Sequence, residues 1–319
     1  MNNQTIKLQV INFSLLLVIV IAMLFISSCD TAPQKKYTDN ATSGNISITV
    51  DESYQPIVDS QLYVFHSIYE KAHVKARYTS EDSAYLDLLF DTVRCIIVGR
   101  EPNNYEKSIF DSIKIKPRIT KIAVDGVALI VNPQNPDSLL DMAELQKIFL
   151  GNADTWNKVR GSKFSEKINI VFDRIGSANA RYIKEKFSPT KPLPSNCFAL
   201  KSNQEVIKYV EENKGAMGLI SINWISDRDD PKVERFLKNV RLVALADSVG
   251  SGEHFKPYQA YLALKNYPLL RNMLAVSKEA RTGLGTGFVS FIAGEKGQRM
   301  VLKSGMVPIN TPVRIISTE

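Results

Sequence analysis

The sequence predicts an α/β protein built from two lobes with a cleft between them, and three observations lead to this prediction. Strand-like and helix-like segments alternate in the first part of the chain, and a second alternating run follows. The two runs are separated by an apolar stretch, residues 119–133, that is too long for an ordinary strand. About 275 residues remain after the N-terminal segments described below, which is more than one hydrophobic core usually accommodates.

The first run has the order strand, helix, strand, helix, strand. We predict strands at 45–50, 73–79 and 94–100, where β-branched and apolar residues dominate. Helices are predicted at 56–72 and 83–92, where apolar residues recur at helical spacing. This order implies a parallel sheet with helices on its faces.

The stretch "ITKIAVDGVALIVNP", 119–133, is interrupted only by Asp125 and Gly126, and we interpret it as a connection that crosses between the lobes. The second run then follows as helix 138–151, strand 168–172, helices at about 180–187 and 203–213, and strands 216–222 and 240–245. "KPYQAYLAL", 256–264, is predicted to return as a second long strand, before a helical region at 286–305 and a closing segment. Two similar units joined by two crossings predict two lobes with a cleft.

The stretch "VFDRIGSANARYIKEKF", 171–187, passes from a buried strand through a turn of small residues into an amphipathic helix. In open parallel sheets, ligands bind beyond the carboxyl ends of the strands, where helix N-termini present unpaired N–H groups. We therefore expect a binding site at this turn.

The N-terminal segment predicts export. Lys7 precedes an almost unbroken apolar run that ends in "ISSC" at Cys29, as in a signal peptide, residues 1–28, with a lipobox. A transmembrane anchor is the alternative, since the run is near the lower limit for spanning a bilayer. After processing, a lipidated Cys29 and a polar, flexible leash, residues 29–45, would precede the folded part. We expect a cell-envelope protein, lipid-anchored to a membrane and facing the periplasm or the exterior.

The composition excludes several classes of function. The formal net charge is +7, but Lys and Arg are scattered among 33 acidic residues, so no nucleic-acid-binding stripe is predicted. There is no Gly-x-Ser-x-Gly elbow, and His66, His73 and His254 lack metal-ligand spacing. We therefore predict that the protein is not an enzyme and has no metal and no cofactor. Cys95 lies in an apolar strand and is interpreted as a buried free thiol, although pairing with Cys197 stays open.

Three stretches carry a resemblance to a known family. "VDGVALIVNPQNPDSLLDMAELQKIFLGNADTWNKV" resembles the inter-lobe crossing and following helix of the phosphate-binding proteins that serve ABC phosphate transporters. "GAMGLISINWI" is similar to the family's Gly-Ala-Ile-Gly-Tyr stretch, and "FIAGEKGQRMVLKSGMVPI" to its closing Gly-Gln and Gly-(Tyr/Leu)-Val-Pro signature. The ordered set spans about residues 46–312. "DESYQPIVDSQLYVF" looks closest to the lipoprotein branch found in Bacteroidetes-type bacteria.

The resemblance implies a type 2 periplasmic-binding-protein fold, in which two lobes close over a dehydrated oxyanion. We place lobe 1 at residues 46–125 plus 259–319 and lobe 2 at residues 126–258. The implied ligand is inorganic phosphate or a similar oxyanion, and the implied partners are the permease subunits of an ABC importer. Backbone N–H groups at helix N-termini would hold the anion, with hydroxyl groups and one Arg completing the shell.

Carried over position by position, the resemblance implies ligand contacts from residues on both lobes. They are Ser53, Tyr54, Ser80, Ser83, Arg100, Asp125, Arg174, Ser177, Asn179 and Arg181. The structural alternatives are capping turns or N-caps for the hydroxyl groups, a surface salt bridge for Arg100, and a turn with Gly126 for Asp125. Asp125 would accept a proton from a protonated phosphate and so reject sulfate.

The turn at 176–181 departs most from the family pattern. Ala178 and Asn179 stand where the family has hydroxyl-bearing or Gly residues, and Arg174 matches the family's Arg in only one of two registers. Two functions therefore stay open. The protein either captures an oxyanion for import, or is a non-transport envelope scaffold or sensor with the same fold and a degraded pocket.

Overall fold

The computed structural model describes residues 38–226, 231–247 and 252–313. The chain divides into two units, Met1–Thr38 and Asp39–Glu319, and the fold described here is that of the second. The predicted signal peptide, Cys29 and the leash up to residue 37 lie outside the described residues. Within the described ranges, no helix is both long and apolar enough to cross a membrane.

The first lobe is built on three parallel strands, as the alternation of elements predicts. β1 (Gly44–Asp51) pairs with β2 (Ala72–Thr79) on one side and with β3 (Cys95–Val98) on the other. The intervening elements are η1 (Glu52–Tyr54), α2 (Gln55–Ile68) and α3 (Glu81–Leu89), and α4 (Asn104–Ser112) follows β3. The last four residues of β1 and all of β3 are buried, as expected for strands with helices on both faces.

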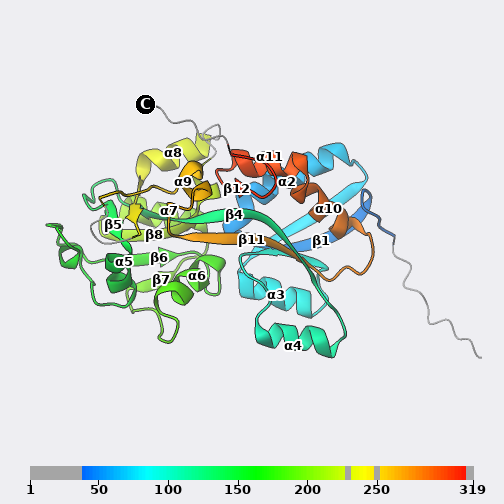
Figure 1. Ribbon diagram of the computed structural model, residues 1–319, viewed down its shortest axis with the longest axis horizontal. Helices are drawn as coiled ribbons and strands as arrows, with labels where there is room; N and C mark the ends of the chain where they lie inside the picture. Colours follow the sequence, from blue (N-terminus) through cyan, green and yellow to red (C-terminus); the bar gives the residue numbers. More distant parts are fainter. Residues whose placement is uncertain (1–37, 227–230, 248–251, 314–319) are drawn as a thin grey trace, which may run out of the picture. The chain divides into compact units, whose positions relative to one another are not determined.

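Two long strands connect the lobes (Figure 1). β4 (Arg118–Val131) is the predicted first crossing, and its first half pairs with β11 (Leu270–Ser277) while its second half pairs with β8 (Ala216–Ser221). β11 also pairs with β3, so a single sheet runs in the order β2-β1-β3-β11-β4-β8-β6-β7. β4 and β11 are antiparallel and lie side by side (Figure 1).

The prediction of a returning strand at 256–264 is wrong. This segment contains a short helix, α9 (Gln259–Ala263), and the second crossing is β11, a few residues later. Tyr258, Tyr261 and Leu262 recur at helical rather than alternating spacing, which is the signal that was missed. Gly126 of β4 accommodates α9, because a Cβ at this position would lie 2.7 Å from Cδ2 of Leu262.

The second lobe repeats the pattern of the first. β8 pairs in parallel with β6 (Asn169–Phe172), and β6 pairs in parallel with β7 (Cys197–Ala199). The other elements of this lobe are β5 (Leu139–Asp141), α5 (Met142–Phe149), η2 (Trp156–Lys158), α6 (Ala178–Phe187), α7 (Asn203–Glu212), η3 (Ile222–Trp224), α8 (Pro231–Asn239), β9 (Arg241–Leu242) and β10 (Ala244–Ala246). The chain then returns through β11 to α10 (Leu284–Ala293), α11 (Glu295–Lys303) and β12 (Val307–Pro308).

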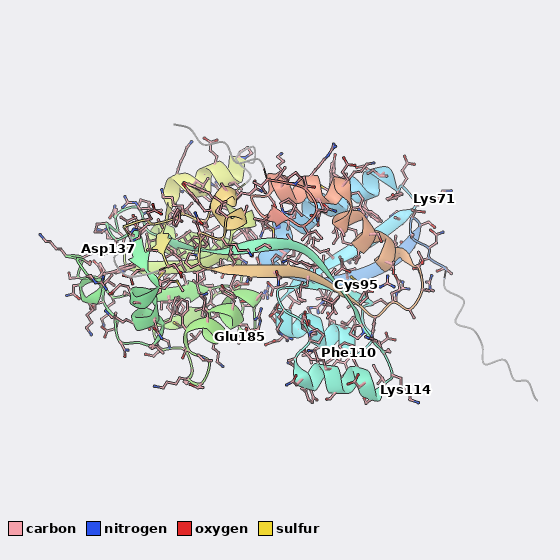
Figure 2. All side chains as sticks on the ribbon, in the orientation of Figure 1. Lys71, Cys95, Phe110, Lys114, Asp137 and Glu185 are labelled. Carbon is pink, nitrogen blue, oxygen red and sulfur yellow. The ribbon has the colours of Figure 1, made fainter. Side chains whose placement is uncertain are left out.

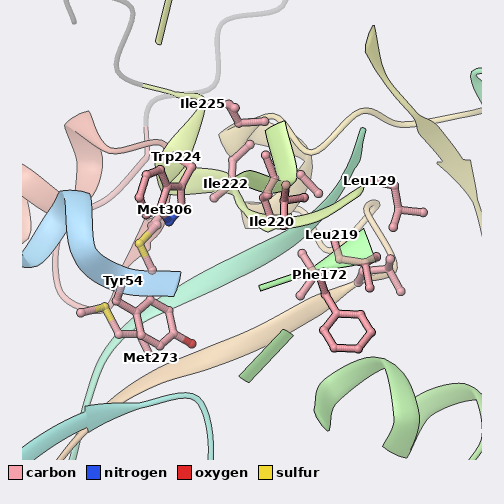
Figure 3. Packing of buried hydrophobic residues seen from close by; sticks show 14 of the residues in the cluster. Tyr54, Leu129, Phe172, Leu219, Ile220, Ile222, Trp224, Ile225, Met273 and Met306 are labelled. Atoms are coloured by element: carbon pink, nitrogen blue, oxygen red, sulfur yellow. The ribbon is translucent and has the colours of Figure 1, made fainter. Parts of the chain in front are cut away.

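One hydrophobic cluster continues from the first lobe into the second. Figure 3 shows a section of it, with Tyr54, Met273 and Trp224 toward one end of the view and Phe172 and Leu219 toward the other. Since apolar side chains are packed continuously along the crossings, the two lobes share a core where β4 and β11 pass between them.

Asp39, which was predicted within the flexible leash, is tied to the first lobe. Its carboxylate accepts from the backbone N–H of Leu284 at 2.9 Å and forms ion pairs with Arg94 and Arg281 at 3.2 and 2.6 Å. Both cysteines of the described residues are free thiols, and Cys95 is buried in β3 (Figure 2), as predicted.

Candidate anion-binding site

The carboxyl ends of strands from both lobes meet at one junction. Asp51 is the last residue of β1, and its Oδ2 accepts from the backbone N–H of Ala178, the first residue of α6, at 3.1 Å. The side chain of Asn223, in η3 of the second lobe, donates from Nδ2 to the carbonyl oxygen of Ser53 at 2.7 Å. The helix starts of the two lobes therefore converge, as the sequence predicts.

The start of α6 is organised by three buried polar side chains. Ser177 is the N-cap residue, and its Oγ accepts from the backbone N–H of Ala180 at 3.3 Å. The same Oγ donates to Oδ1 of Asp173 at 2.8 Å, and Asn179 Nδ2 donates to that oxygen at 3.0 Å. Ser177 and Asn179, both predicted as ligand contacts, thus already contact a carboxylate of their own chain.

Carboxylates of the first lobe accept from backbone N–H groups at this junction. Asp51 Oδ1 accepts from Ser53 N at 3.0 Å, and the Glu52 carboxylate accepts from the backbone N–H and the side-chain amide of Asn203, the first residue of α7. Glu81 Oε1 accepts from the backbone N–H of Gly99 at 2.6 Å. These are donors of the kind that hold an anion at helix N-termini, and here the chain supplies the anions itself.

Arg100 and Arg181 are engaged with acidic side chains. Arg100 forms a two-point hydrogen bond with the Glu106 carboxylate, at 2.6 and 2.9 Å, and lies 3.4 Å from Glu81 Oε2. Arg181, on α6, donates from Nε to the same oxygen of Glu81, which links the two lobes, and from Nη1 to Glu185 at 2.6 Å. Two of the predicted ligand-binding cations therefore have carboxylate partners within the protein.

A third cation, Arg271, comes from β11. Its Nε donates to Oδ2 of Asp125 at 2.8 Å, its guanidinium lies 5.2 Å from the centre of the Tyr54 ring, and its side chain is only 2% exposed. Asp125 Oδ1 accepts from Ser221 Oγ at 2.7 Å. The predicted acceptor Asp125 is thus held by a buried ion pair and a hydroxyl group.

Several buried polar atoms at the junction have no hydrogen-bond partner among the described residues. The donors are Nη1 and Nη2 of Arg271, Nη2 of Arg181 and Oγ of Ser53. The acceptors are Oδ2 of Asp173 and Oδ1 of Asn179. Buried polar groups normally have partners, so these atoms indicate a place for a bound solute or ordered water.

Burial raises the pKa of three carboxyl groups at the junction, those of Asp51, Glu52 and Asp173. Burial, together with the charge of Asp173, raises the pKa of Asp51 to about 7. Burial also raises the pKa of Glu52 to about 7, and burial with the nearby Glu52 raises that of Asp173 to about 6. The cause is the same in each case: a charge removed from water beside other negative charges.

The remaining predicted residues lie as follows. Tyr54 is fully buried, and its hydroxyl donates to the carbonyl oxygen of Asn272 at 3.2 Å. Ser80 is the N-cap of α3, and its Oγ accepts from Ser83 N at 3.4 Å. Arg174 is exposed, although it is near enough to Glu52 to lower the pKa of that carboxyl slightly against the effect of burial.

Sequence reasoning missed Arg271 and the acidic residues Asp51, Glu52, Glu81 and Asp173. The acidic residues lie beside predicted ligand contacts at strand ends, and that position was the available signal. Arg271 offered no signal, because β11 was not recognised as a strand. Within the described ranges, no group of His, Cys, Asp and Glu side chains could hold a metal ion.

Comparison with known proteins identifies the family of this chain. The PBP superfamily domain matches residues 35–296 of the chain. The chain belongs to the PBP superfamily. This PBP superfamily member is 22% identical over 303 residues to the phosphate-binding protein PstS of Bacillus subtilis (strain 168). The alignment covers 92% of this chain and 93% of that relative.

Solved structures agree with this placement. A structure from Clostridium perfringens, named for a phosphate ABC transporter substrate-binding protein with bound phosphate, aligns with a TM-score of 0.70 and 21% identity, covering 84% of this chain and 100% of that one. An ABC-type phosphate transport receptor from Vibrio cholerae aligns with a TM-score of 0.63 and 20% identity, covering 83% and 100%. The predicted resemblance and the two-lobed type 2 fold are confirmed.

Proposed function

We propose that this protein is a lipid-anchored solute-binding protein of the cell envelope that captures phosphate or a related oxyanion for an ABC importer. The observation that carries the proposal is a set of buried donors, on Arg271, Arg181 and Ser53, that have no partner within the part of the chain the structure describes. They lie at a junction where helix N-termini from both lobes converge. Donors fixed in a dry site replace the water around an anion, and charge-assisted bonds to guanidinium groups are the strongest of them. The relatives named above support the choice of phosphate.

Arg271 is the central cation in this proposal. It is the buried guanidinium whose two Nη atoms both lack partners among the described residues, whereas Arg100 is bound to Glu106 at two points and Arg174 is exposed. Ser53 and Arg181 would complete the donor set. We therefore assign the positive charge of the site to the return crossing instead of the turn before α6.

A second function is favoured by a different observation. The carboxylates of Asp51, Glu52 and Glu81 accept from backbone N–H groups that an anion would otherwise use. A site filled in this way fits a non-transport scaffold or sensor of the envelope with the same fold. The two functions differ in whether any oxyanion binds.

Isothermal titration calorimetry of the full chain in mild detergent distinguishes them. We expect heat of binding with phosphate between pH 5.5 and 8.5, and little or none for Arg271→Gln, since loss of a charged hydrogen-bond partner weakens binding by about 1.5–3 kcal/mol or more. Arg77→Gln is the matched control, because Arg77 is exposed and should leave binding unchanged. No heat from the unaltered chain with phosphate or sulfate throughout this range would refute capture and leave the scaffold or sensor.

The anchor has its own test. Cys29→Ala should move the protein from the membrane fraction to the soluble fraction and abolish incorporation of a labelled fatty acid. Retention in the membrane by the variant would instead indicate a transmembrane anchor.

A further inference from the structure

The N terminus of α6 is occupied by a side chain of the opposite lobe. Asp51 Oδ2 accepts from Ala178 N at 3.1 Å, and Asp51 itself is fully buried. Two further donors at this turn are also in use, since Ala180 N donates to Ser177 Oγ and Ser177 Oγ donates to Asp173. A solute that accepts from the Ala178 N–H must therefore displace the Asp51 carboxylate.

Two neighbouring side chains carry donors that have no partner among the described residues. Ser53, whose backbone N–H is bound to Asp51 Oδ1, carries a buried Oγ with no partner among the described residues. The guanidinium of Arg271 acts on the charge of Asp51, and its two Nη atoms have no partner among the described residues. Because buried polar groups normally have partners, these atoms are a second indication of a ligand near the start of α6.

The charged groups that act on Asp51 come from several elements of both lobes. Asp173 directly after β6, Glu81 on α3 and Glu52 in the same turn are acidic, and Arg271 on β11 is a cation that acts on Asp51. Glu81 is itself neutralised in part by Arg181 and Arg100. An added anion in this acidic surrounding is repelled unless a proton removes the charge of Asp51.

Resting on the proposed function, we propose that the Asp51 carboxylate competes with the oxyanion for the N terminus of α6. Asp51 leaves this position when it takes up a proton, so its protonation state decides whether the site accepts an anion. The neutral carboxyl no longer repels the anion, and its O–H can donate to an anion oxygen. Binding of the oxyanion is then coupled to uptake of one proton at Asp51. Apart from this proton uptake, the binding step forms and breaks no covalent bond.

The coupling predicts how affinity changes with pH. With the pKa of Asp51 raised by burial and by Asp173 to about 7, binding that requires a proton at Asp51 weakens by about thirtyfold as the pH rises from 5.5 to 8.5. Asp51→Asn removes the titrating group and the charge. Dividing the dissociation constant of the unaltered chain by that of Asp51→Asn removes the effect of phosphate ionisation, because that effect is the same for both proteins.

The experiment titrates inorganic phosphate calorimetrically into the full chain, Asp51→Asn and Asp82→Asn at pH 5.5 and 8.5. We expect the dissociation constant of the unaltered chain, divided by that of Asp51→Asn, to rise about thirtyfold from pH 5.5 to pH 8.5. Asp82→Asn is the control, because it changes the same formal charge near the same turn, but its carboxylate is 63% exposed. A constant ratio for Asp51→Asn, with phosphate bound normally, would overturn the role of Asp51 and leave the proposed function standing.

If phosphate binds Asp51→Asn but not the unaltered chain at either pH, competition by Asp51 is supported and import of phosphate is refuted. If neither chain binds phosphate, the protonation of Asp51 can still be followed without a ligand. In spectra of ¹⁵N-alanine-labelled protein, the amide resonance of Ala178 should titrate near pH 7 in the unaltered chain and not in Asp51→Asn. An Ala178 resonance that does not move with pH in the unaltered chain would overturn the inference.

Discussion

Replacing Arg271 with Gln removes the cation of a buried ion pair. The guanidinium Nε lies 2.8 Å from Asp125 Oδ2, and the two side chains are 2% and 0% exposed. At an effective dielectric constant of about 20, two unit charges at this separation attract by about 6 kcal/mol. The desolvation of both groups offsets part of this attraction, but the variant leaves Asp125 buried and unpaired. We therefore expect the free energy of unfolding to fall by about 3–5 kcal/mol.

Urea denaturation of the full chain in mild detergent measures this change, with Arg271→Gln, Asp125→Asn and the double variant forming a cycle. The double variant should be more stable than the sum of the single changes predicts, since it leaves no unpaired charge. Lys158→Gln is a control, because the ion pair of Lys158 with Asp154 is exposed and should change stability little. A loss below 1 kcal/mol for Arg271→Gln would refute the reasoning, as would full additivity in the cycle.

Three further predictions follow from the same junction. Ser53→Ala should leave stability unchanged within about 0.5 kcal/mol, because its Oγ has no partner among the described residues, yet weaken phosphate binding by about 1 kcal/mol in calorimetry. Gly99→Ala would place a Cβ 2.9 Å from the Tyr54 hydroxyl oxygen and 3.2 Å from Cβ of Ala178, so thermal unfolding should show a loss of about 1–3 kcal/mol. The pKa of Asp51 is raised from 3.8 to about 7 by burial and by Asp173, so its contribution to stability is complete below about pH 4 and is lost as the pH rises through 7. Urea denaturation at pH 5 and pH 8 should show the unaltered chain losing stability more steeply than Asp51→Asn, by up to about 1.4 kcal/mol per pH unit.

Local pattern predicted much of the fold. The alternation of strands and helices in the first lobe, the first crossing at β4 and the turn before α6 all follow from periodicity and capping chemistry within short windows. Ser177, for example, is an N-cap whose partner, Ala180, is three residues away. The same reasoning failed at 256–264, where helical spacing over a few residues was mistaken for a strand and β11 was overlooked.

The sequence by itself determined the two-lobed α/β architecture and the placing of helix starts at the strand ends, because these depend on neighbours along the chain. Only the tertiary structure decided what those helix starts contact. The partner of Asp51 is 127 residues away, at Ala178, and the partner of Arg271 is 146 residues away, at Asp125. Whether a carboxylate lies in water or against a helix N-terminus depends on such distant contacts, and that difference alone changes its charge and what the site can bind.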